Sequence, residues 1–367
     1  MIGDRPFLPP DVDTPALIVD LDVVEANNRR LVSHLAERGV SLRPHAKTHK
    51  SVAIARMQLE AGATGITVGT LGEAEVFTRA GIGDVFLAYP LFAVGPKAAR
   101  LRALHERSPI AVGVDSVAGA ERLAAAVAGL ASPLRILVEV DSGGRRTGVD
   151  SGGTAALVAG AARRLGLDVV GVFTHAGHGY AGPEARGTAA ADEVRALGDA
   201  ALALRAAGFA CEIVSAGSTP TMWDATGGEV SEMRAGTYVL GDRQQAALGA
   251  ISLDDVALHV AATVVSTAVA GQVVIDAGAK TLTKDRAPFL DGHGHIRGYP
   301  DAVIERLSDY HGAVRIVDGA PAPRLGEVVA IVPNHVCPVV DLFDSFITVR
   351  GETVLETWPV DARGRRG

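Results

Sequence analysis

Residues 41–70 read SLRPHAKTHKSVAIARMQLEAGATGITVGT. A short strand is predicted over 41–47 and another over 65–70, with an Ala- and Leu-containing segment between them. Strands that alternate with helical segments are typical of βαβ units, whose strands run parallel. This stretch therefore predicts one repeat of a parallel α/β sheet.

The same alternation extends from residue 16 to residue 219. The near-continuous apolar character of the strands fits a sheet that is covered by helices. Eight repeats favour a TIM (β/α)8 barrel, which we place at residues 16–245, and an open doubly wound sheet remains the alternative. The predicted strands are Ala16–Leu21, Ser41–Lys47, Gly65–Thr70, Asp84–Pro90, Ile110–Ser116, Arg135–Asp141, Asp168–His175 and Glu212–Thr219.

The pattern changes after about residue 240, where short predicted strands are separated by Gly, Pro and Asp turns. We expect a second, C-terminal all-β domain over residues 246–367, which residues 1–15 could join. The loop over 279–300 is rich in Gly and Pro, and we expect it to be functional or mobile. The strands predicted here are Val256–Val269, Gly271–Ala277, Val314–Val317, Glu327–Val332 and Phe346–Glu352.

The bulk composition excludes several classes of protein. The formal net charge of −7 offers no general attraction to nucleic acid or to an anionic membrane. No run of about 18 apolar residues occurs, and the first residues do not form a secretory signal. Only two cysteines are present, too few for a disulfide framework. We expect a soluble protein of a reducing compartment, the cytoplasm, with no nucleic-acid or membrane partner.

Basic side chains are concentrated at the end of the second predicted strand. In an extended chain Arg43, His45, Lys47 and His49 would share one face. Four basic groups at the C-terminal rim of a barrel, where active sites lie, would repel one another unless an anion lay among them. An exposed basic turn and a site for phosphate alone are the alternatives. A lysine among cations is also suited to Schiff-base chemistry.

Two segments carry a family resemblance: PHAKTHK at residues 44–50 and GITVGTLGEAEVFTRAGIGDVFLAYP at residues 65–90. They resemble the D-threonine aldolase and D-serine dehydratase group of enzymes that use pyridoxal 5′-phosphate (PLP), and the resemblance runs over most of the chain. It implies an alanine-racemase-like barrel of fold type III followed by a β-domain. It also implies a homodimer and a D-amino acid substrate, with Lys47 holding PLP as a Schiff base.

Further motifs follow later strands, and the resemblance gives them roles. Arg146, in the glycine-rich turn after the sixth strand, is expected beside the cofactor ring, although two arginines there also suit a solvated turn. His175, at the end of the seventh strand, is also expected to contact the ring. His178 and Tyr180 are candidate acid or base groups on the substrate side.

Two turns are candidates for holding the phosphate of PLP. Ser218 and Thr219 follow the eighth predicted strand, and barrel loops in this place often bind phosphate. The turn at Gly236, Thr237 and Tyr238 is similar to the family's second phosphate-binding turn. Each turn alone has ordinary turn composition.

The last motif is His335-Val336-Cys337, near a late predicted strand. An imidazole and a thiolate suit zinc, although a buried cysteine beside a histidine is a commoner arrangement. The resemblance favours a divalent metal on His335 and Cys337: zinc first, with manganese or magnesium as alternatives. It implies His-x-Cys in the dehydratases and His-x-Asp in typical aldolases. His293 and His295 are a competing pair, which we interpret as loop residues.

The expected activity is that of a PLP- and metal-dependent lyase acting on D-β-hydroxy-α-amino acids. D-serine dehydratase activity, which gives pyruvate and ammonia, is favoured by Cys337 and by the loop with His178. The alternative is retro-aldol cleavage to glycine and an aldehyde. Three further hypotheses are a PLP-binding protein without turnover, a lysine Schiff-base aldolase without PLP, and a cofactor-free phosphosugar isomerase.

Overall fold

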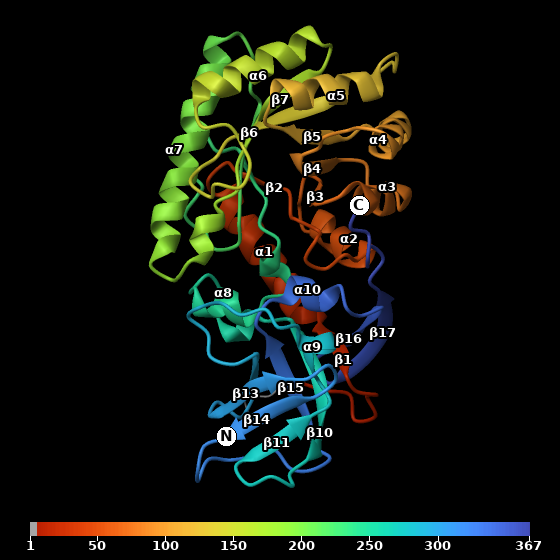
Figure 1. Ribbon diagram of the computed structural model, residues 1–367, viewed down its shortest axis with the longest axis vertical. Coiled ribbons are helices and arrows are strands. Elements are labelled where there is room, and N and C mark those ends of the chain that lie inside the picture. Colours follow the sequence, from red (N-terminus) through yellow and green to blue (C-terminus); the bar gives the residue numbers. More distant parts are fainter. Residues whose placement is uncertain (1–5) are drawn as a thin grey trace. The chain divides into compact units, whose positions relative to one another are not determined.

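The computed structural model describes residues 6–367, and the chain divides into two compact units (Figure 1). The first, here the β unit, contains the described part of Met1–Asn28 together with Thr48–Ala53 and Thr237–Arg363. The second, here the barrel unit, contains Arg29–Lys47, Ile54–Gly236 and Gly364–Gly367. Each unit therefore consists of segments that are distant in sequence.

Eight parallel strands form the sheet of the barrel unit, in the order β2-β9-β8-β7-β6-β5-β4-β3 among the described residues. A parallel bridge between His45 and Thr67 joins the two ends of this order, so the sheet closes. The strands are β2 (Ser41–Leu42), β3 (Ile66–Val68), β4 (Val85–Pro90), β5 (Ala111–Val114), β6 (Arg135–Glu139), β7 (Asp168–Phe173), β8 (Ile213–Ala216) and β9 (Glu232–Met233). The predicted barrel is thereby confirmed, and the open-sheet alternative is wrong.

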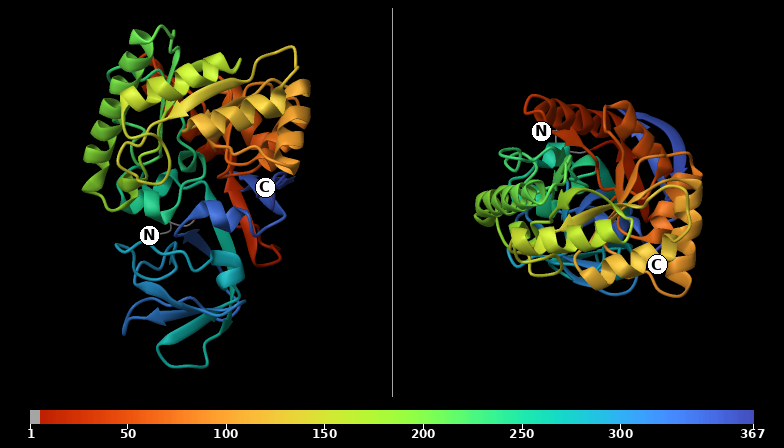
Figure 2. Two further views of the ribbon diagram at one scale, coloured as in Figure 1. Left: turned by 45° about the horizontal axis from the view of Figure 1, so that its top comes forward. Right: turned by 90° about the horizontal axis from the view of Figure 1, so that it is seen from above.

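Helices cover the outside of this sheet, and both views of Figure 2 show them around the strands in orange to green. Several of these helices have a serine or threonine N-cap, whose side chain accepts a hydrogen bond from a backbone N–H of the first turn. Thr70, Ser116 and Ser151 are examples. The helices that follow the strands are α2 (Val52–Glu60), α3 (Leu71–Arg79), α4 (Pro96–Arg107), α5 (Val117–Val127), α6 (Gly152–Arg164) and α7 (Ala185–Ala206). The division between the units falls within α1 (Leu21–Ala36).

The interior of the barrel contains aromatic rings and small residues. The Phe86 and Phe173 rings meet edge to face, with centroids 5.1 Å apart, and pack with Ala111 and Leu137. A Cβ atom at Gly113 would lie 2.6 Å from the Phe173 ring, so only glycine leaves room for that ring.

Two strand predictions are corrected by the structure. The strand predicted over 16–21 forms as β1 (Ala16–Asp20) but pairs with strands of the β unit. The eighth barrel strand is instead β9, which we did not predict. Because Leu17, Ile18 and Val19 are all buried, this apolar run would suit either sheet. Residues 16–28 and 237–245 thus lie in the β unit, so the division differs from the predicted boundary at 245/246.

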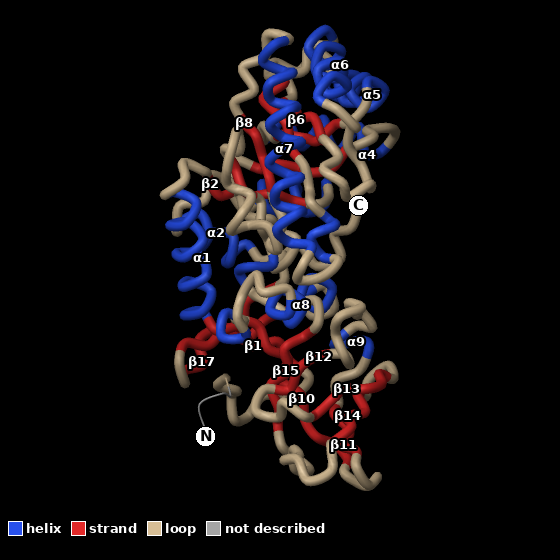
Figure 3. The backbone as a smooth tube through the Cα atoms, turned by 90° about the vertical axis from the view of Figure 1, so that its left-hand side faces the viewer, coloured by secondary structure: helices blue, strands red, loops and turns tan. Residues whose placement is uncertain are grey.

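The β unit contains a nine-stranded sheet within the described chain, with the order β11-β14-β13-β12-β15-β10-β1-β16-β17 (Figure 3). An additional pairing of β11 with β10 closes six of these strands on themselves. All neighbours are antiparallel except β1 and β16. The strands are β10 (Leu258–Ser266), β11 (Gln272–Ile275), β12 (Gly294–Ile296), β13 (Ala302–Leu307), β14 (Gly312–Ile316), β15 (Val328–Pro333), β16 (Ser345–Arg350) and β17 (Thr353–Pro359).

Short helices complete the β unit: α8 (Arg243–Ala247), α9 (Ala279–Leu282) and α10 (Val336–Val340). Helix α9 and strand β12 lie within the stretch 279–300 that we predicted to be a loop without structure, so that prediction is wrong in part. Among residues 6–367, no helix combines the length and the hydrophobicity that a transmembrane segment needs.

Buried His259, on β10, predicts a dependence of stability on pH. Its Nε2 has no hydrogen-bond partner among the described residues. Burial, and then the charges of Arg297 and His295, lowers the pKa of His259 to about 3 from an ordinary value of 6.5. Between these values the unfolded chain binds a proton here and the folded chain does not. Stability from this residue is therefore lost as the pH falls from about 6.5 toward 3.

Replacing His259 by leucine is expected to reduce that loss by up to about 1.4 kcal/mol for each pH unit within this range. The measurement is the denaturant midpoint at several pH values, with exposed His311→Gln as the control. Parallel pH profiles for the wild-type protein and the His259→Leu variant would contradict this assignment.

Candidate functional site

Lys47 lies in the barrel unit, just after the bridge at His45, and its side chain is exposed. The chain turns over residues 46–49, and the Lys47 backbone N–H donates to His45 Nδ1 at 3.3 Å. The positive charge of Lys47 acts on the imidazole of His175, so the two predicted residues are close enough for their charges to interact.

The predicted face of four basic residues is wrong. Arg43 is buried, and its guanidinium bonds to Glu232 at 2.6 Å and to Asp84 at 2.9 Å. His49 is also buried, with its Nδ1 accepting from the backbone N–H of Ser51 at 3.1 Å. The alternation of an extended strand ends at the turn over 46–49, so these side chains do not share one face.

His175 follows β7 and is held as a neutral imidazole. Burial first, and then the charges of Lys47, Arg146 and Arg234, lowers the pKa of His175 to about 3. Its Nδ1 lies 3.1 Å from the carbonyl oxygen of Gly217. A neutral ring donates from Nδ1 to that carbonyl, which leaves Nε2 as an acceptor.

The glycine-rich turn after β6 packs against the segment after β7. A Cβ atom at Gly143 would lie 3.3 Å from the His178 ring, and one at Gly144 would lie 3.3 Å from the carbonyl oxygen of His175. Arg146 extends from this turn with 61% of its side chain exposed, 4.0 Å from Glu139. Arg146 is therefore accessible, and its charge also acts on His175.

His178 and Tyr180 lie on a short 3-10 helix, Gly177–Tyr180, after β7. His178 Nε2 is 3.3 Å from Asp192 Oδ2, the distance of an ion pair. The Tyr180 ring is tilted against His175, with centroids 6.3 Å apart. Asp192, on α7, is thus a carboxylate that can orient the predicted acid–base histidine.

Glu193, also on α7, connects the segments that follow β7 and β8. Its carboxylate is fully buried and accepts from the backbone N–H groups of Ala176 and Gly217 and from the Thr221 hydroxyl at 2.6 Å. Burial raises the pKa of Glu193. We did not predict this residue, although its spacing from buried Leu197 could have placed it on the inner face of the helix.

The Ser218–Thr219 turn offers hydroxyl groups after β8. Ser218 Oγ lies 3.0 Å from Thr221 Oγ1, whereas the buried Thr219 hydroxyl has no hydrogen-bond partner within residues 6–367. Gly217 has φ +146°, and a Cβ atom there would lie 2.6 Å from the Arg234 backbone nitrogen. An unsatisfied buried hydroxyl beside a tight glycine turn fits an anionic group such as phosphate.

The second predicted phosphate turn has a different environment. Gly236 is the last residue of this segment of the barrel unit, and Thr237 and Tyr238 begin the next segment of the β unit. The Tyr238 hydroxyl is buried and donates to Asn28 Oδ1 at 2.9 Å. This structure therefore commits that hydroxyl to Asn28 and not to a ligand.

His335 and Cys337 lie in the β unit, where β15 leads into α10. His335 is the residue before the helix, so the pair lies just after strand β15, and its two side chains are hydrogen-bonded to each other. His335 Nδ1 is 2.6 Å from Asp285 Oδ2. Burial alone would lower the pKa of His335, but Cys337, Asp242 and Asp285 outweigh it and raise the pKa to about 10.

The donor atoms of this pair fit a soft divalent metal. Because Asp285 occupies Nδ1, His335 has Nε2 for a metal, and Cys337 supplies Sγ. The Thr48 hydroxyl is 3.3 Å from that sulfur. In the described part of the chain no three or more His, Cys, Asp or Glu side chains form a metal-binding group. Water or substrate would have to complete the coordination, and His293 and His295 belong to no such group either.

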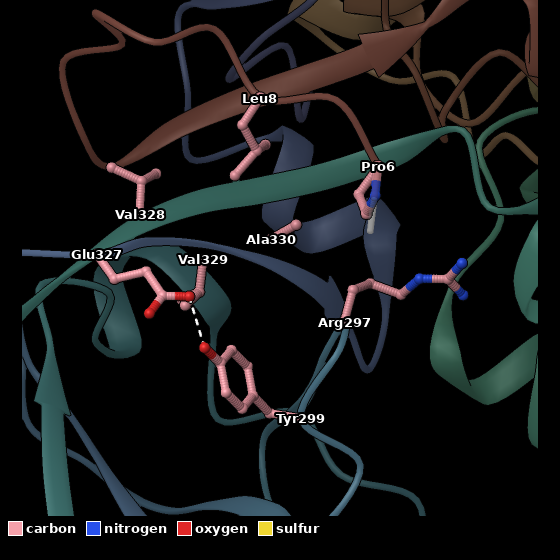
Figure 4. A pocket seen from close by; sticks show the side chains of 8 residues that line it. All are labelled: Pro6, Leu8, Arg297, Tyr299, Glu327, Val328, Val329 and Ala330. Carbon is pink, nitrogen blue, oxygen red and sulfur yellow. Dashed lines mark hydrogen bonds between the residues drawn. The ribbon is translucent and has the colours of Figure 1, made fainter. Parts of the chain in front are cut away.

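A separate cavity of about 170 Å³ lies in the β unit and is shown in Figure 4. Arg297, Tyr299 and Glu327 line it beside Leu8, and the Tyr299 hydroxyl donates to Glu327 at 2.6 Å. None of the predicted site residues lines this cavity, so we assign it no part in the chemistry.

Comparisons with known proteins match both parts of the chain. The family model "Alanine racemase, N-terminal domain" matches residues 19–244, and "Putative serine dehydratase domain" matches residues 257–349. The D-threo-3-hydroxyaspartate dehydratase of Delftia sp. (strain HT23) is 37% identical, over 95% of this chain and 97% of that protein. The D-threonine aldolase of Arthrobacter sp. is 35% identical, over 96% of this chain and 93% of that protein.

A solved structure agrees with this match. It is a cysteine-to-alanine variant of D-threo-3-hydroxyaspartate dehydratase in the metal-free form, 35% identical to this chain. It superposes with a TM-score of 0.88 and covers 95% of this chain and 97% of its own. The barrel and the β-domain are therefore both shared with solved relatives.

Proposed function

Because the chain belongs to the alanine-racemase-like family of PLP-dependent lyases, we propose that it dehydrates D-amino acids that carry a β-hydroxyl group. Loss of water from D-serine, followed by hydrolysis of the resulting imine with release of ammonia, would give pyruvate. The observation that carries this proposal is the hydrogen-bonded pair of His335 and Cys337. By the resemblance, this His-x-Cys arrangement is the one of the dehydratases.

The residues of the barrel unit fit PLP. Lys47 offers an exposed amine, Arg146 an accessible cation, and Thr219 a buried hydroxyl without a partner among the described residues. We propose that Ser218 and Thr219 bind the phosphate and that neutral His175 lies against the ring. When bound, PLP supplies an electron sink for the bonds of the substrate's Cα.

The protein's own part in the reaction is proton transfer and orientation. We assign Lys47 the transfer of the proton at Cα, because its exposed amine can act as a base beside the bound substrate. His178, paired with Asp192, and Tyr180 remain the proposed groups for a proton at the β-hydroxyl. Glu193 holds the segments after β7 and β8 together, and so positions His175 against the phosphate turn.

We propose that His335 Nε2 and Cys337 Sγ hold a divalent metal, zinc first, with manganese and magnesium as alternatives. Such an ion would act as a Lewis acid on the β-oxygen of the substrate. The hydrogen bond that Nδ1 donates to Asp285, which leaves Nε2 for a metal, supports this role.

Retro-aldol cleavage is the second candidate. The 35% identity to a D-threonine aldolase favours it, and the same lysine and metal pair would serve it. The difference lies in which proton is removed: removal from Cα leads to elimination, and removal from the β-hydroxyl leads to cleavage of the Cα–Cβ bond. Products distinguish the two routes directly.

The test supplies the PLP-loaded chain with D-serine, D-threonine and D-3-hydroxyaspartate, with each metal and with a chelator. We expect ammonia together with pyruvate, 2-oxobutyrate or oxaloacetate, and loss of turnover when the metal is removed. Formation of glycine and an aldehyde would contradict the dehydratase proposal and would support retro-aldol cleavage instead. No product from any substrate, with PLP bound, would favour a PLP-binding protein without turnover.

A further inference from the structure

We infer that Asp285 is a positioning residue for the metal: its carboxylate fixes the His335 imidazole so that Nε2 faces the ion. This inference rests on the metal role proposed above for His335 and Cys337, and it concerns residues of the β unit alone. It also gives a function to the stretch 279–300, whose Gly/Pro-rich sequence predicted a functional or mobile loop.

The contact between Asp285 and His335 is short and specific. Asp285 Oδ2 lies 2.6 Å from Nδ1, and 49% of the Asp285 side chain is exposed against 35% of that of His335. A carboxylate at this distance accepts the proton of Nδ1 and leaves Nε2 as the nitrogen for a metal. The metal would take the place of any proton on Nε2.

The backbone of Asp285 is held on both sides. Its N–H donates to Thr283 Oγ1 at 3.2 Å, and its carbonyl oxygen accepts from Asn334 Nδ2 at 3.2 Å. Asn334 Nδ2 also donates to the carbonyl oxygen of Gly292 at 3.0 Å. Asn334, the residue before His335, therefore anchors the loop that carries Asp285. Contacts to the backbone of this loop thus bring Asp285 and His335 together, in addition to the hydrogen bond between their side chains.

Helix α8 holds the backbone around His335. The Gln244 N–H donates to the carbonyl oxygen of Asn334 at 3.1 Å. The Val336 N–H donates to Asp242 Oδ2 at 3.1 Å, and Asp242 is fully buried. With the residues before and after His335 both fixed, rotation of the side chain is the main freedom left to the imidazole. The contact with Asp285 removes that freedom.

The chemistry predicts a measurable effect on metal binding. A carboxylate that accepts from a ligating imidazole orients the ring and makes it a stronger ligand, and its loss typically costs 10–100-fold in metal affinity. A surface ion pair without this role contributes about 0–1 kcal/mol to stability and leaves metal affinity unchanged. Metal affinity therefore separates the two roles.

The experiment uses full-length, PLP-loaded protein stripped of metal, and it measures the zinc dissociation constant by competition with a chromophoric chelator. Asp285→Ala is expected to weaken zinc binding by about 10–100-fold. Asp285→Asn, which keeps an acceptor without the charge, is expected to fall between Asp285→Ala and wild type. PLP content and the thermal midpoint should remain those of wild type, so the readout does not depend on activity.

The matched control is Asp309→Ala, because Asp309 is an exposed carboxylate of the same unit paired with Lys280 at 3.2 Å. Cobalt in place of zinc gives a second readout: its ligand-field spectrum should change in Asp285→Ala and not in the control. Equal zinc affinity in Asp285→Ala, Asp309→Ala and wild type would overturn the positioning role while the proposed metal pair stands. Failure of the wild-type chain to bind any metal would overturn both.

Discussion

Replacement of Lys47 by alanine is expected to lower kcat by about 10²–10⁴-fold or more, which is the usual contribution of one positioned proton-transfer group. The variant would also lose the amine that attaches the cofactor, so the defect has a chemical readout besides rate. Borohydride reduction followed by digestion should place a pyridoxyl mass on the Lys47 peptide of the wild-type protein and on no peptide of the variant.

Lys97→Ala is the control, because Lys97 is an exposed lysine of the same unit on helix α4. It should retain wild-type kcat and the pyridoxyl mass at Lys47. A pyridoxyl group on a different lysine of fully loaded wild-type protein, or unchanged turnover in Lys47→Ala, would remove the basis of the proposed function.

Replacement of Glu232 by alanine is expected to have the largest effect on stability, about 3–5 kcal/mol, because it would leave buried Arg43 with the more exposed Asp84 as its remaining carboxylate partner. Glu232 Oε2 accepts from Arg43 Nε at 2.6 Å, and only 6% and 5% of the Arg43 and Glu232 side chains are exposed. The other carboxylate oxygen accepts from Ser215 Oγ at 2.6 Å. Buried Arg234 donates to the same Ser215 hydroxyl, so removal of the Glu232 carboxylate would also weaken the hydrogen-bond network around Arg234.

The measurement is the shift in the denaturant and thermal midpoints. Glu229→Ala is the matched control, because Glu229 lies close to Glu232 in sequence and its carboxylate also pairs with an arginine, Arg205. In contrast to Glu232, 39% of the Glu229 side chain is exposed. That variant should lose no more than about 1 kcal/mol. Similar midpoints for the two variants would mean that the ion pairs inside the barrel contribute no more than those at its surface.

The repeated strand–helix pattern predicted the barrel because consecutive parallel strands need a covering helix, and this regularity is visible locally. Strand β9 was missed because it is only two residues long, Glu232–Met233, and its glutamate faces a cation that follows β2. Strand β1 was assigned to the wrong sheet because an apolar run does not identify its partner strand. Pairing is a property of the folded chain, not of the run itself.

The same distinction applies to the site. Lys47 and His175 were predicted from strand ends, where the barrel itself brings residues together. Arg43 was predicted as part of the anion site because we extended the side-chain alternation of a strand through residue 47, whereas strand β2 ends at Leu42. Asp285 and Glu193 were not predicted, since each makes its hydrogen bond to a residue distant in sequence: His335 for the first, and Gly217 for the second.

The position of β1 has a consequence for synthesis of the protein. This strand leaves the ribosome early, yet its antiparallel partner β10 begins only at Leu258 and its parallel partner β16 only at Ser345. Until those segments emerge, the nascent chain carries an apolar strand edge without a partner, which is a site for aggregation. A truncated chain ending at residue 245 would keep that edge permanently and should be captured by chaperones or precipitate.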